Sequence, residues 1–398
     1  MDLMLGNGPT VDRRLDHAGA QGSAGLGALR GRALLISDHD YRTARRANMH
    51  PIADALARLG CEVCFVSVRF SALSRLKGDS RTFLWDRANR PEIQNGVQCY
   101  LWKTPFHPFH PHMPIVNEVA TLAYRAYAHW PNRFLDEAMR TASFIVVESG
   151  LGALLMQRAR DRNPSATIVY VASDELATVG VHPFVQAQLE AAIDDIDQVC
   201  VPSPRMAPRF EWARDRLFYV PHGLNAADFP EDEPSPYATP RNAVSVGSML
   251  FDRTVFTHAA ARLPDVQFHV IGAGEQFDAP DNVHIHSEMP FRDTVRFIRH
   301  ADIGIAPYRP APGCDYLCDT SMKLMQYEYF GVPAVCPTFA AGERGDRFGY
   351  RPGDASSIEA AMRAALDKGR TATPKSFLSW EDVVRRLVDP RAFPDTVL

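Results

Sequence analysis

The 398-residue sequence predicts an α/β protein made of two doubly wound parallel-sheet domains. Short apolar runs of strand length alternate with amphipathic runs of helical length, which is typical of parallel sheets covered by helices on both faces. The chain is too long for one ordinary domain and long enough for two. The alternating pattern also occurs twice, on either side of a segment rich in proline and acidic residues. We therefore expect two similar domains with a cleft between them.

The first predicted domain spans residues 28–220 and follows a Gly- and Ala-rich extension, residues 1–27, that we predict to be flexible. Its opening strand covers 33–37, and a polar loop and a helix around 47–59 follow. Four further apolar runs repeat the strand pattern: 61–68, 144–147, 167–171 and 198–201. Because a parallel sheet presents its site beyond the carboxyl ends of its strands, the residues that follow these runs are candidates for function.

A second strand series begins after residues 221–240, a proline-rich and acidic stretch without periodicity that we interpret as an interdomain linker. The second predicted domain spans 241–378. Its strands are predicted at 243–246, 267–271, 284–286, 303–307 and 334–336, and its helices near 254–262, 292–300, 322–330 and 357–368. Residues 379–398 contain a helix of their own, which we expect to cross back to the first domain.

Composition argues against several classes of protein. The formal net charge of −4 is unlike that of a nucleic-acid-binding protein, which is usually strongly basic. No uncharged apolar run approaches the roughly 18 residues of a membrane-spanning helix, and residues 1–27 lack the apolar segment of a signal peptide. The seven cysteines are scattered and lie mostly in or beside apolar runs. We therefore predict free, packed thiols and a cytoplasmic protein.

Motifs that commonly indicate a cofactor or a metal are incomplete in this sequence. Gly272 and Gly274 follow a strand, but Phe277 stands where a dinucleotide fingerprint needs its third glycine, and no GxxxxGK[ST] phosphate loop occurs. Asp38 and Asp40 form a DxD pair whose carboxylates could hold a divalent cation. The pair lies in the first βα loop of a two-domain pattern, so we favour a loop or capping role. We expect no cofactor and no metal.

The most informative segment is SMKLMQYEYFGVPAV at 321–335, which reads as a helix stopped by Gly-x-Pro. Asp319, Thr320 and Ser321 offer N-cap oxygens before it, and a helix N-terminus can bind a diphosphate without a metal. Lys323 falls in the first turn, where the helix dipole disfavours a cation unless an anion is bound. We interpret Lys323 as a phosphate ligand, with a surface lysine as the alternative.

Two residues near this helix are further candidates. Gln326 lies one turn beyond Lys323 on the same face, where it could reach a ribose or a sugar. Tyr308 ends a predicted strand and is either a stacking partner for a base or a core tyrosine. The spacing of VGSMLFD (246–252), FHVIGAG (268–274) and ADIGIAPY (301–308) before the helix resembles the nucleotide-sugar half of GT-B glycosyltransferases. That resemblance implies two Rossmann-like domains that face each other across a cleft.

Longer sequence segments in both halves resemble one particular family with this fold. They stand in order across residues 37–357: SDHDYRTARRANMH, FSALSRLKGD, NGVQCYLW, VVESG, VYVASDELATV, GSMLFD, SMKLMQY, PAVCP and FGYRPGDASS. Together they resemble the bacterial β-1,2-glucuronosyltransferases of xanthan-type exopolysaccharide assembly. The resemblance implies an inverting, metal-independent transfer from UDP-glucuronate to a polyprenyl-diphosphate-linked oligosaccharide that ends in mannose.

The resemblance also implies site residues. Asp174 matches the catalytic base, and it follows the predicted strand 167–171. An inverting transfer needs one carboxylate to take the proton of the acceptor hydroxyl, whereas the alternative role for Asp174 is an N-cap of the next helix. Glu175 replaces a glycine of the family pattern, and this extra acid could raise the pKa of Asp174 or shift contacts with the acceptor. The implied donor-binding positions are Met249, Glu288, Met289, Tyr308, Leu317, Met322, Lys323 and Gln326. The methionines could equally be core residues.

The first half carries a local excess of positive charge. Residues 30–103 contain thirteen Lys and Arg against seven Asp and Glu. Such a surface suits a lipid diphosphate and an anionic membrane, with a solvated charged face as the alternative. Residues 107–130 place apolar side chains on one helical face, for packing on the sheet or for insertion into the membrane interface: Val116, Val119, Ala120, Ala123, Tyr127 and Trp130. We expect a peripheral protein on the cytoplasmic face of the inner membrane.

Three kinds of function stay open at this point. We predict glucuronate transfer, with another UDP-sugar transferase of the GT-B fold as its nearest variant. A UDP-sugar 2-epimerase of the same fold needs no lipid acceptor and leaves the basic region unexplained. A non-catalytic sugar-nucleotide binder is expected to lose Asp174 or Lys323, and both are present.

Overall fold

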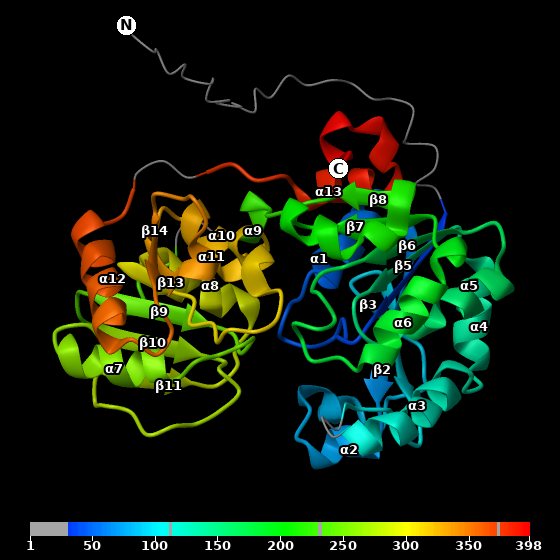
Figure 1. Ribbon diagram of the computed structural model, residues 1–398, viewed down its shortest axis with the longest axis horizontal. Helices are drawn as coiled ribbons and strands as arrows, with labels where there is room; N and C mark the ends of the chain where they lie inside the picture. The colour runs from blue at the N-terminus through cyan, green and yellow to red at the C-terminus, as the bar shows by residue number, and fades with distance from the viewer. Residues whose placement is uncertain (1–30, 111–113, 230–232, 372–374) are drawn as a thin grey trace, which may run out of the picture.

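The computed structural model describes residues 31–110, 114–229, 233–371 and 375–398, and of 114–119 the backbone only. The predicted extension over 1–27 lies outside the described residues. Two twisted sheets, each with helices packed on its faces, lie side by side (Figure 1). The α/β class and the two-sheet organisation agree with the sequence-based expectation.

The first sheet has eight strands in the order β3-β4-β2-β1-β5-β6-β7-β8, and all neighbours pair in parallel except β3 and β4. The strands are β1 (Arg32–Ser37), β2 (Glu62–Phe70), β3 (Glu92–Gln94), β4 (Val97–Lys103), β5 (Phe144–Glu148), β6 (Thr167–Val171), β7 (Gln198–Val201) and β8 (Leu217–Tyr219). Its helices include α1 (Met49–Arg58), α2 (Ala72–Leu76), α3 (Pro114–Ala128), α4 (Arg133–Thr141), α5 (Met156–Arg162) and α6 (Pro183–Ala191). The central strands are almost entirely buried, which explains their continuous apolar sequences.

The β3–β4 hairpin is an element that the apolar pattern did not predict. Gln94 pairs with Val97, so Asn95 and Gly96 form a two-residue loop. Their φ angles are 50° and 80°, which are both in the left-handed region that a type I′ turn requires. The Asn-Gly dipeptide was therefore the available signal. Strand β3 is short and half-exposed, so it carries no strong apolar pattern of its own.

The second sheet has six parallel strands in the order β11-β10-β9-β12-β13-β14. The strands are β9 (Asn242–Val246), β10 (Gln267–Ile271), β11 (Val283–His286), β12 (Ile303–Ile305), β13 (Ala334–Pro337) and β14 (Arg347–Tyr350). Its helices are α7 (Thr254–Arg262), α8 (Phe291–His300), α9 (Leu317–Thr320), α10 (Met322–Tyr329), α11 (Thr338–Ala341) and α12 (Ala355–Lys368). Strand order reverses beside β9, and such a switch point opens a ligand-binding crevice at the carboxyl ends of the strands.

The last helix, α13 (Trp380–Val388), lies over the first domain beside α1 (Figure 1). Trp380 shares a buried cluster with Met49 of α1, and Arg58 forms an ion pair with Glu381 at 2.5 Å. Part of the predicted linker packs on α8, because Tyr237 donates a hydrogen bond to the carbonyl oxygen of Phe297 at 2.7 Å.

Helix α3 shows which of two interpretations holds for the apolar face predicted over 107–130. Tyr127 is fully buried, its ring stacks on Trp102 with 5.0 Å between centroids, and its hydroxyl accepts the Arg69 N–H at 2.9 Å. Ala120 and Trp130 are partly buried against the same core. The described part of this face therefore packs inside the first domain, as the packing interpretation predicted. The side chains of Val116 and Val119 lie outside the described residues.

No helix among the described residues combines the length and the apolar character that crossing a bilayer requires. Six of the seven cysteines are buried free thiols, as the packing interpretation predicted: Cys64, Cys99, Cys200, Cys314, Cys318 and Cys336.

Candidate active site

Loops at the carboxyl ends of the two sheets contact each other directly. The contacts between them include the Tyr316 hydroxyl to Asp174 Oδ1 at 2.9 Å, the Thr178 hydroxyl to the Pro312 carbonyl at 2.6 Å, Arg45 Nη1 to Ser248 Oγ at 3.1 Å, and Arg209 Nη2 to Asp315 Oδ1 at 2.6 Å. The first residue of each pair, apart from Tyr316, belongs to the first domain. These contacts bring the predicted acceptor half and the predicted donor half together at one place.

Asp174 lies at the centre of this junction, three residues after β6. Its N–H donates to Ser149 Oγ at 3.1 Å, and its carboxylate accepts the Tyr316 hydroxyl. Burial raises the pKa of Asp174 to about 6, although the hydrogen bond from Tyr316 and the charge of Arg45 act in the opposite direction. A carboxylate with this pKa is largely ionised at neutral pH and is a stronger base than an exposed aspartate.

The N-cap alternative for Asp174 is wrong, because no helix starts there. The next helix is α6, and its N-cap is His182, which accepts the Phe184 N–H at 3.1 Å. The chain between β6 and α6 instead turns through the interdomain junction, and the Asp174 carboxylate faces Tyr316 of the second domain.

Glu175 points to a different environment from Asp174. Its carboxylate forms an ion pair with Arg209 at 3.3 Å and lies against Gly313, where an added Cβ would stand 2.2 Å from Oε2. Burial is the main cause of the raised pKa of Asp174, and Tyr316 and Arg45 act in the opposite direction. An effect of Glu175 on Asp174 or on acceptor contacts stays a prediction.

Lys323 lies in the first turn of α10, as predicted. Its Nζ is covered from solvent, has no hydrogen-bond partner among the described residues, and stands 5.0 Å from the centroid of the Tyr308 ring. Burial, reinforced by the charge of Arg45, lowers the pKa of Lys323 to about 7. Because an ammonium group has three hydrogen-bond donors, a covered Lys323 without a partner leaves a place for an anion.

The N-cap of α10 is Ser321 alone. Its Oγ accepts the Leu324 N–H at 3.3 Å and contacts the Tyr308 hydroxyl at 2.5 Å. Asp319 and Thr320, which were also expected to supply cap oxygens, belong to the preceding short helix α9. The Asp319 carboxylate instead accepts the Ser203 hydroxyl of the first domain at 2.7 Å.

The Tyr308 ring lies against the Lys323 ammonium. The residue is 2% exposed, its hydroxyl is bonded to Ser321, and its ring faces the Lys323 ammonium. The core interpretation therefore holds in this structure, and the ring has no open face on which a base could stack. Gln326, one turn further along α10, is buried as well.

The remaining predicted donor-binding residues lie in loops and at helix starts along the same sheet edge. Leu317 is buried, Met249, Met289 and Met322 are half-buried against core clusters, and Glu288 is exposed. A cavity of about 580 Å³ opens beside Met249; its lining consists of Ser248, Phe251, Asp252, Arg253, Thr254, Ala273, Gly274, Glu275 and Arg309. The second sheet thus offers a cavity at its carboxyl edge, lined by residues that follow β9, β10 and β12.

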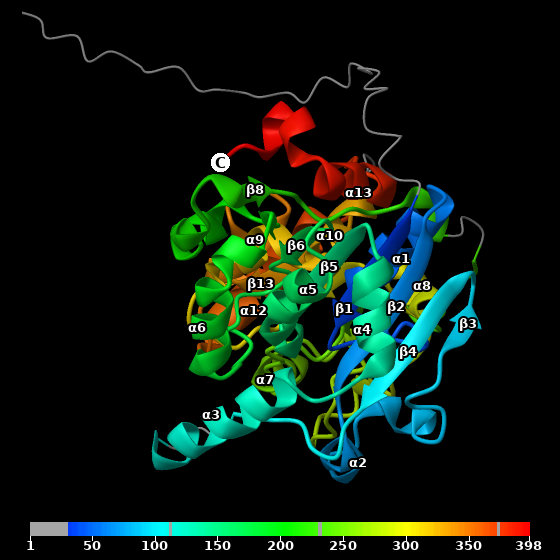
Figure 2. The same cartoon turned by 90° about the vertical axis from the view of Figure 1, so that its right-hand side faces the viewer.

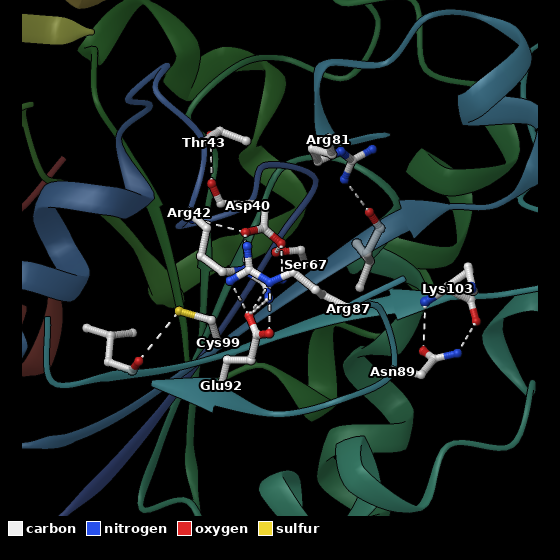
Figure 3. Close-up of polar contacts among 12 residues, drawn as sticks. Asp40, Arg42, Thr43, Ser67, Arg81, Arg87, Asn89, Glu92, Cys99 and Lys103 are labelled. Carbon is white, nitrogen blue, oxygen red and sulfur yellow. Dashed lines mark hydrogen bonds and ion pairs between the residues drawn. The ribbon is translucent and has the colours of Figure 1, made fainter. Parts of the chain in front are cut away.

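The DxD carboxylates have separate internal partners. Asp40 receives two hydrogen bonds from the Arg42 guanidinium, at 2.9 and 2.8 Å, and one from the Ser67 hydroxyl at 2.8 Å (Figure 3). Arg42 also contacts Glu92 at 2.6 Å. Burial acts to raise the pKa of Asp40, but the bonds from Arg42 and Ser67 hold that pKa below its usual value. Asp38 accepts the Leu151 N–H at 3.2 Å. The loop role that we favoured for this pair agrees with these contacts.

The residues that were not predicted from the sequence include three that act on or near Asp174: Tyr316, Arg45 and Glu148. Arg45 and Glu148 lie inside the quoted phrases SDHDYRTARRANMH and VVESG, but nothing local distinguishes them from other charged residues. Tyr316 lies in a 3₁₀ turn, Cys314–Tyr316, after the left-handed Gly313. Its role is visible only when the two domains are placed together.

The comparisons with known structures identify the fold. The fold is that of GT-B glycosyltransferases, as shown by similarity to a trehalose-6-phosphate synthase with a TM-score of 0.58 and 13% identity, over 90% of this chain and 95% of the other. The corresponding Escherichia coli enzyme bound with UDP-2-fluoro glucose aligns with a TM-score of 0.56 and 12% identity, over 89% and 95% of the two chains. At these identities the similarity establishes the fold alone.

Sequence relatives identify the family. The chain is 42% identical over 367 residues to the UDP-glucuronate:glycolipid 2-beta-glucuronosyltransferase of Xanthomonas campestris pv. campestris, which covers 92% of this chain and 91% of that protein. The family model for the N-terminal domain of the glucuronosyltransferase GumK matches residues 35–202. The chain belongs to the GumK glucuronosyltransferase family and is a glycosyltransferase. This result confirms the predicted enzyme class over the epimerase and the non-catalytic binder.

Proposed function

We propose that this enzyme transfers glucuronate from UDP-glucuronate to a mannose-terminated oligosaccharide carried on a polyprenyl diphosphate, with inversion at the anomeric carbon. The observation that carries the proposal is the pairing of two groups. One is the covered Lys323 ammonium of the second domain, which has no hydrogen-bond partner among the described residues, and the other is the half-buried Asp174 carboxylate of the first domain. The 42% identical relative is named as acting on UDP-glucuronate and a glycolipid, which supports the same donor and acceptor classes here.

In the proposed reaction Asp174 is the general base. Its carboxylate takes the proton of the acceptor hydroxyl while the hydroxyl oxygen bonds to the anomeric carbon of glucuronate. The bond from that carbon to the diphosphate oxygen breaks on the opposite face, and UDP leaves with the electron pair. One displacement therefore inverts the configuration and leaves the proton on Asp174. The raised pKa of Asp174, about 6, increases its strength as a base and still leaves it ionised at pH 7.

Lys323 and the N-terminus of α10 stabilise the leaving diphosphate in this proposal. A helix N-terminus presents free N–H groups to phosphate oxygens, and the covered ammonium supplies a full positive charge. Arg45, which reaches from the first domain to Ser248 at 3.1 Å, adds a second cation close to both Lys323 and Asp174. These groups support a metal-independent reaction.

The direct test is incubation of the purified enzyme with UDP-glucuronate, with and without a mannose-terminated lipid acceptor, in the presence and absence of EDTA. We expect UDP release and a glucuronylated lipid only when the acceptor is present, with an unchanged rate in EDTA. The anomeric configuration of the product is read by NMR. Release of a free epimer, or donor binding without turnover, would contradict the proposal.

The contact between Tyr316 and Asp174 predicts a specific pH dependence. The Tyr316 hydroxyl stabilises the ionised Asp174, so Tyr316→Phe should raise the pKa of Asp174 above its present value of about 6. Protonated Asp174 cannot accept a proton. As pH falls, the variant should therefore lose activity at a higher pH than the wild type. We expect the acidic limb of kcat/KM to move upwards by roughly one pH unit, because hydrogen bonds to charged groups contribute about 1.5–3 kcal/mol and part of this is screened.

The matched control for this experiment is Tyr350→Phe. Tyr350 is a buried tyrosine of the second domain, and its hydroxyl has no hydrogen-bond partner among the described residues. The acidic limb of kcat/KM in Tyr350→Phe should coincide with that of the wild type. An unchanged limb in Tyr316→Phe would show that Tyr316 does not act on the base.

We further propose that the enzyme binds the cytoplasmic face of the inner membrane through one end of the first domain. Exposed apolar side chains gather on α2, the turn after it, the loop before α3, and α3: Leu76, Phe83, Phe109 and Leu122. Helices α2 and α3 lie at the same end of this domain (Figure 2). Lys77 covers the Phe109 ring at 4.8 Å, so cations accompany the apolar groups, as interfacial binding to anionic lipids requires.

The membrane proposal predicts that Leu76→Asp combined with Phe109→Asp reduces binding to vesicles that contain anionic lipid. Both changes remove exposed apolar area and add negative charge to the surface that we expect to face the bilayer. Co-sedimentation should show a loss of roughly tenfold or more, and wild-type binding should weaken as salt rises. The control is Ile93→Asp, an equally exposed apolar residue on the edge strand β3. Equal losses in both variants would contradict the assignment of this surface.

A further inference from the structure

Glu148 is a buried carboxyl group that the proposed reaction does not yet use. It is the last residue of β5, which lies between β1 and β6 in the sheet. The residue is 5% exposed. Its Oε2 accepts the Ser37 hydroxyl at 2.5 Å, and its Oε1 accepts the Ser173 hydroxyl at 3.0 Å. One side chain therefore connects the carboxyl ends of three neighbouring strands.

These contacts lead directly to Asp174. Ser173 immediately precedes Asp174, and Ser149, the residue after Glu148, accepts the Asp174 N–H at 3.1 Å. The Ser149 N–H in turn donates to the carbonyl of Val171 at the end of β6, at 3.0 Å. The short segment that carries Asp174 is thus held by Glu148 on one side and by Ser149 on the other.

Neutral groups could make the same hydrogen bonds. A glutamine amide accepts through its oxygen and donates through its nitrogen, and a serine hydroxyl can rotate to suit either partner. Burial of a carboxyl group is costly unless its charge is compensated. No cation contacts Glu148 among the residues that the structure describes, and its hydrogen-bond partners are two hydroxyls. A structural role alone therefore does not explain why the residue is ionisable.

The electrostatic surroundings of Glu148 are acidic. Asp174 and Asp38 both face it, and the buried hydroxyl of Tyr170 lies in the field of all three carboxyl groups. Burial, together with repulsion by Asp174 and Asp38, raises the pKa of Glu148 to about 7, while its two serine partners act in the opposite direction. The nearby cations belong to the other carboxylates: Arg69 pairs with Asp38 at 3.3 Å, and Arg45 acts on Asp174.

We propose that Glu148 is a positioning residue for the general base, which orients the Asp174 segment through Ser173 and tunes the basicity of Asp174 by its own ionisation. The inference rests on the proposed role of Asp174. Two interacting carboxyl groups that titrate near neutrality exchange protons as a pair. At pH values where the pair carries one proton, the proton lies on either group. The enzyme is productive when the proton is on Glu148 and Asp174 is ionised, and unproductive when the proton is on Asp174.

The test is Glu148→Gln, read as the pH profile of kcat/KM. The neutral amide keeps the shape and removes the neighbouring charge, so Asp174 should ionise at lower pH and as a single group. We expect the acidic limb to move downwards by about half a pH unit or more. The matched control is Glu175→Gln, which removes the carboxylate next to Asp174 in the chain, one that is paired with Arg209. The acidic limb of its pH profile should coincide with that of the wild type.

An unchanged limb in Glu148→Gln would overturn the proposal even if the melting temperature fell, because a purely structural role lowers stability without moving a pKa. Should that variant not fold, Ser37→Ala replaces it. Loss of a hydroxyl donor raises the pKa of Glu148, keeps Glu148 neutral, and should give a smaller shift in the same direction. Asp174→Asn separates the two hypotheses. If it stays active, the assignment of the base fails, whereas an inactive Asp174→Asn with a normal Glu148→Gln profile overturns the Glu148 inference alone.

Discussion

Asp174→Asn is expected to lower kcat by about 10²–10⁴, the usual contribution of a general base. Asparagine keeps the shape of the side chain and can still accept the Tyr316 hydroxyl, but it cannot take a proton from the acceptor. Affinity for UDP-glucuronate should hardly change, because the proposed diphosphate contacts lie on α10. Turnover is measured as UDP release with saturating lipid acceptor, and donor affinity is measured separately by calorimetry.

The control for this substitution is Glu175→Gln, which should retain most activity because Glu175 faces Arg209 and Gly313. Asp174→Asn turnover within about threefold of the wild type would show that another group is the base. Loss of donor binding in the same variant would indicate a folding defect or a donor-site role. A product with retained anomeric configuration would exclude the single displacement altogether.

Lys323→Ala is expected to weaken UDP-glucuronate binding by roughly ten- to a hundredfold, as loss of a charge-assisted hydrogen bond typically costs about 1.5–3 kcal/mol. This ammonium is covered over the Tyr308 ring and has no hydrogen-bond partner in the part of the chain that the structure describes, so we expect the diphosphate to be its partner. The comparison is Lys368→Ala, a lysine in the last turn of α12. A donor affinity equal to that of the wild type in Lys323→Ala would contradict the role.

The lowered pKa of Lys323 predicts that donor binding depends on pH. Its pKa is lowered to about 7 in the free enzyme, and a bound dianion should raise it again. Affinity for UDP should therefore be highest below pH 7 and fall as pH rises through 7, since a neutral Lys323 must take up a proton on binding. Calorimetry in two buffers with different ionisation enthalpies should detect this uptake in the wild type and not in Lys323→Ala.

Much of the fold was predictable because parallel strands buried on both faces are continuous apolar runs. The runs over 33–37, 144–147, 167–171 and 198–201 correspond to β1, β5, β6 and β7 within a residue. The β3–β4 hairpin was missed because its strands lie at the sheet edge, where one short strand is half-exposed. Its Asn-Gly turn was a usable signal, since only such residues adopt two consecutive left-handed conformations easily.

The sequence by itself determined the family, the two-domain α/β architecture, and the placement of Lys323 in a first helical turn, because these depend on local periodicity, on helix electrostatics and on matched phrases. The tertiary structure alone decided what each polar side chain faces. It turned Glu175 towards Arg209, placed Tyr308 beneath Lys323, brought Tyr316 to Asp174, and connected Glu148 to Ser37 and Ser173. The partners in most of these contacts are separated by many residues in the chain or belong to different domains. The burial that moves the pKa values of Asp174, Glu148 and Lys323 exists only in the folded chain.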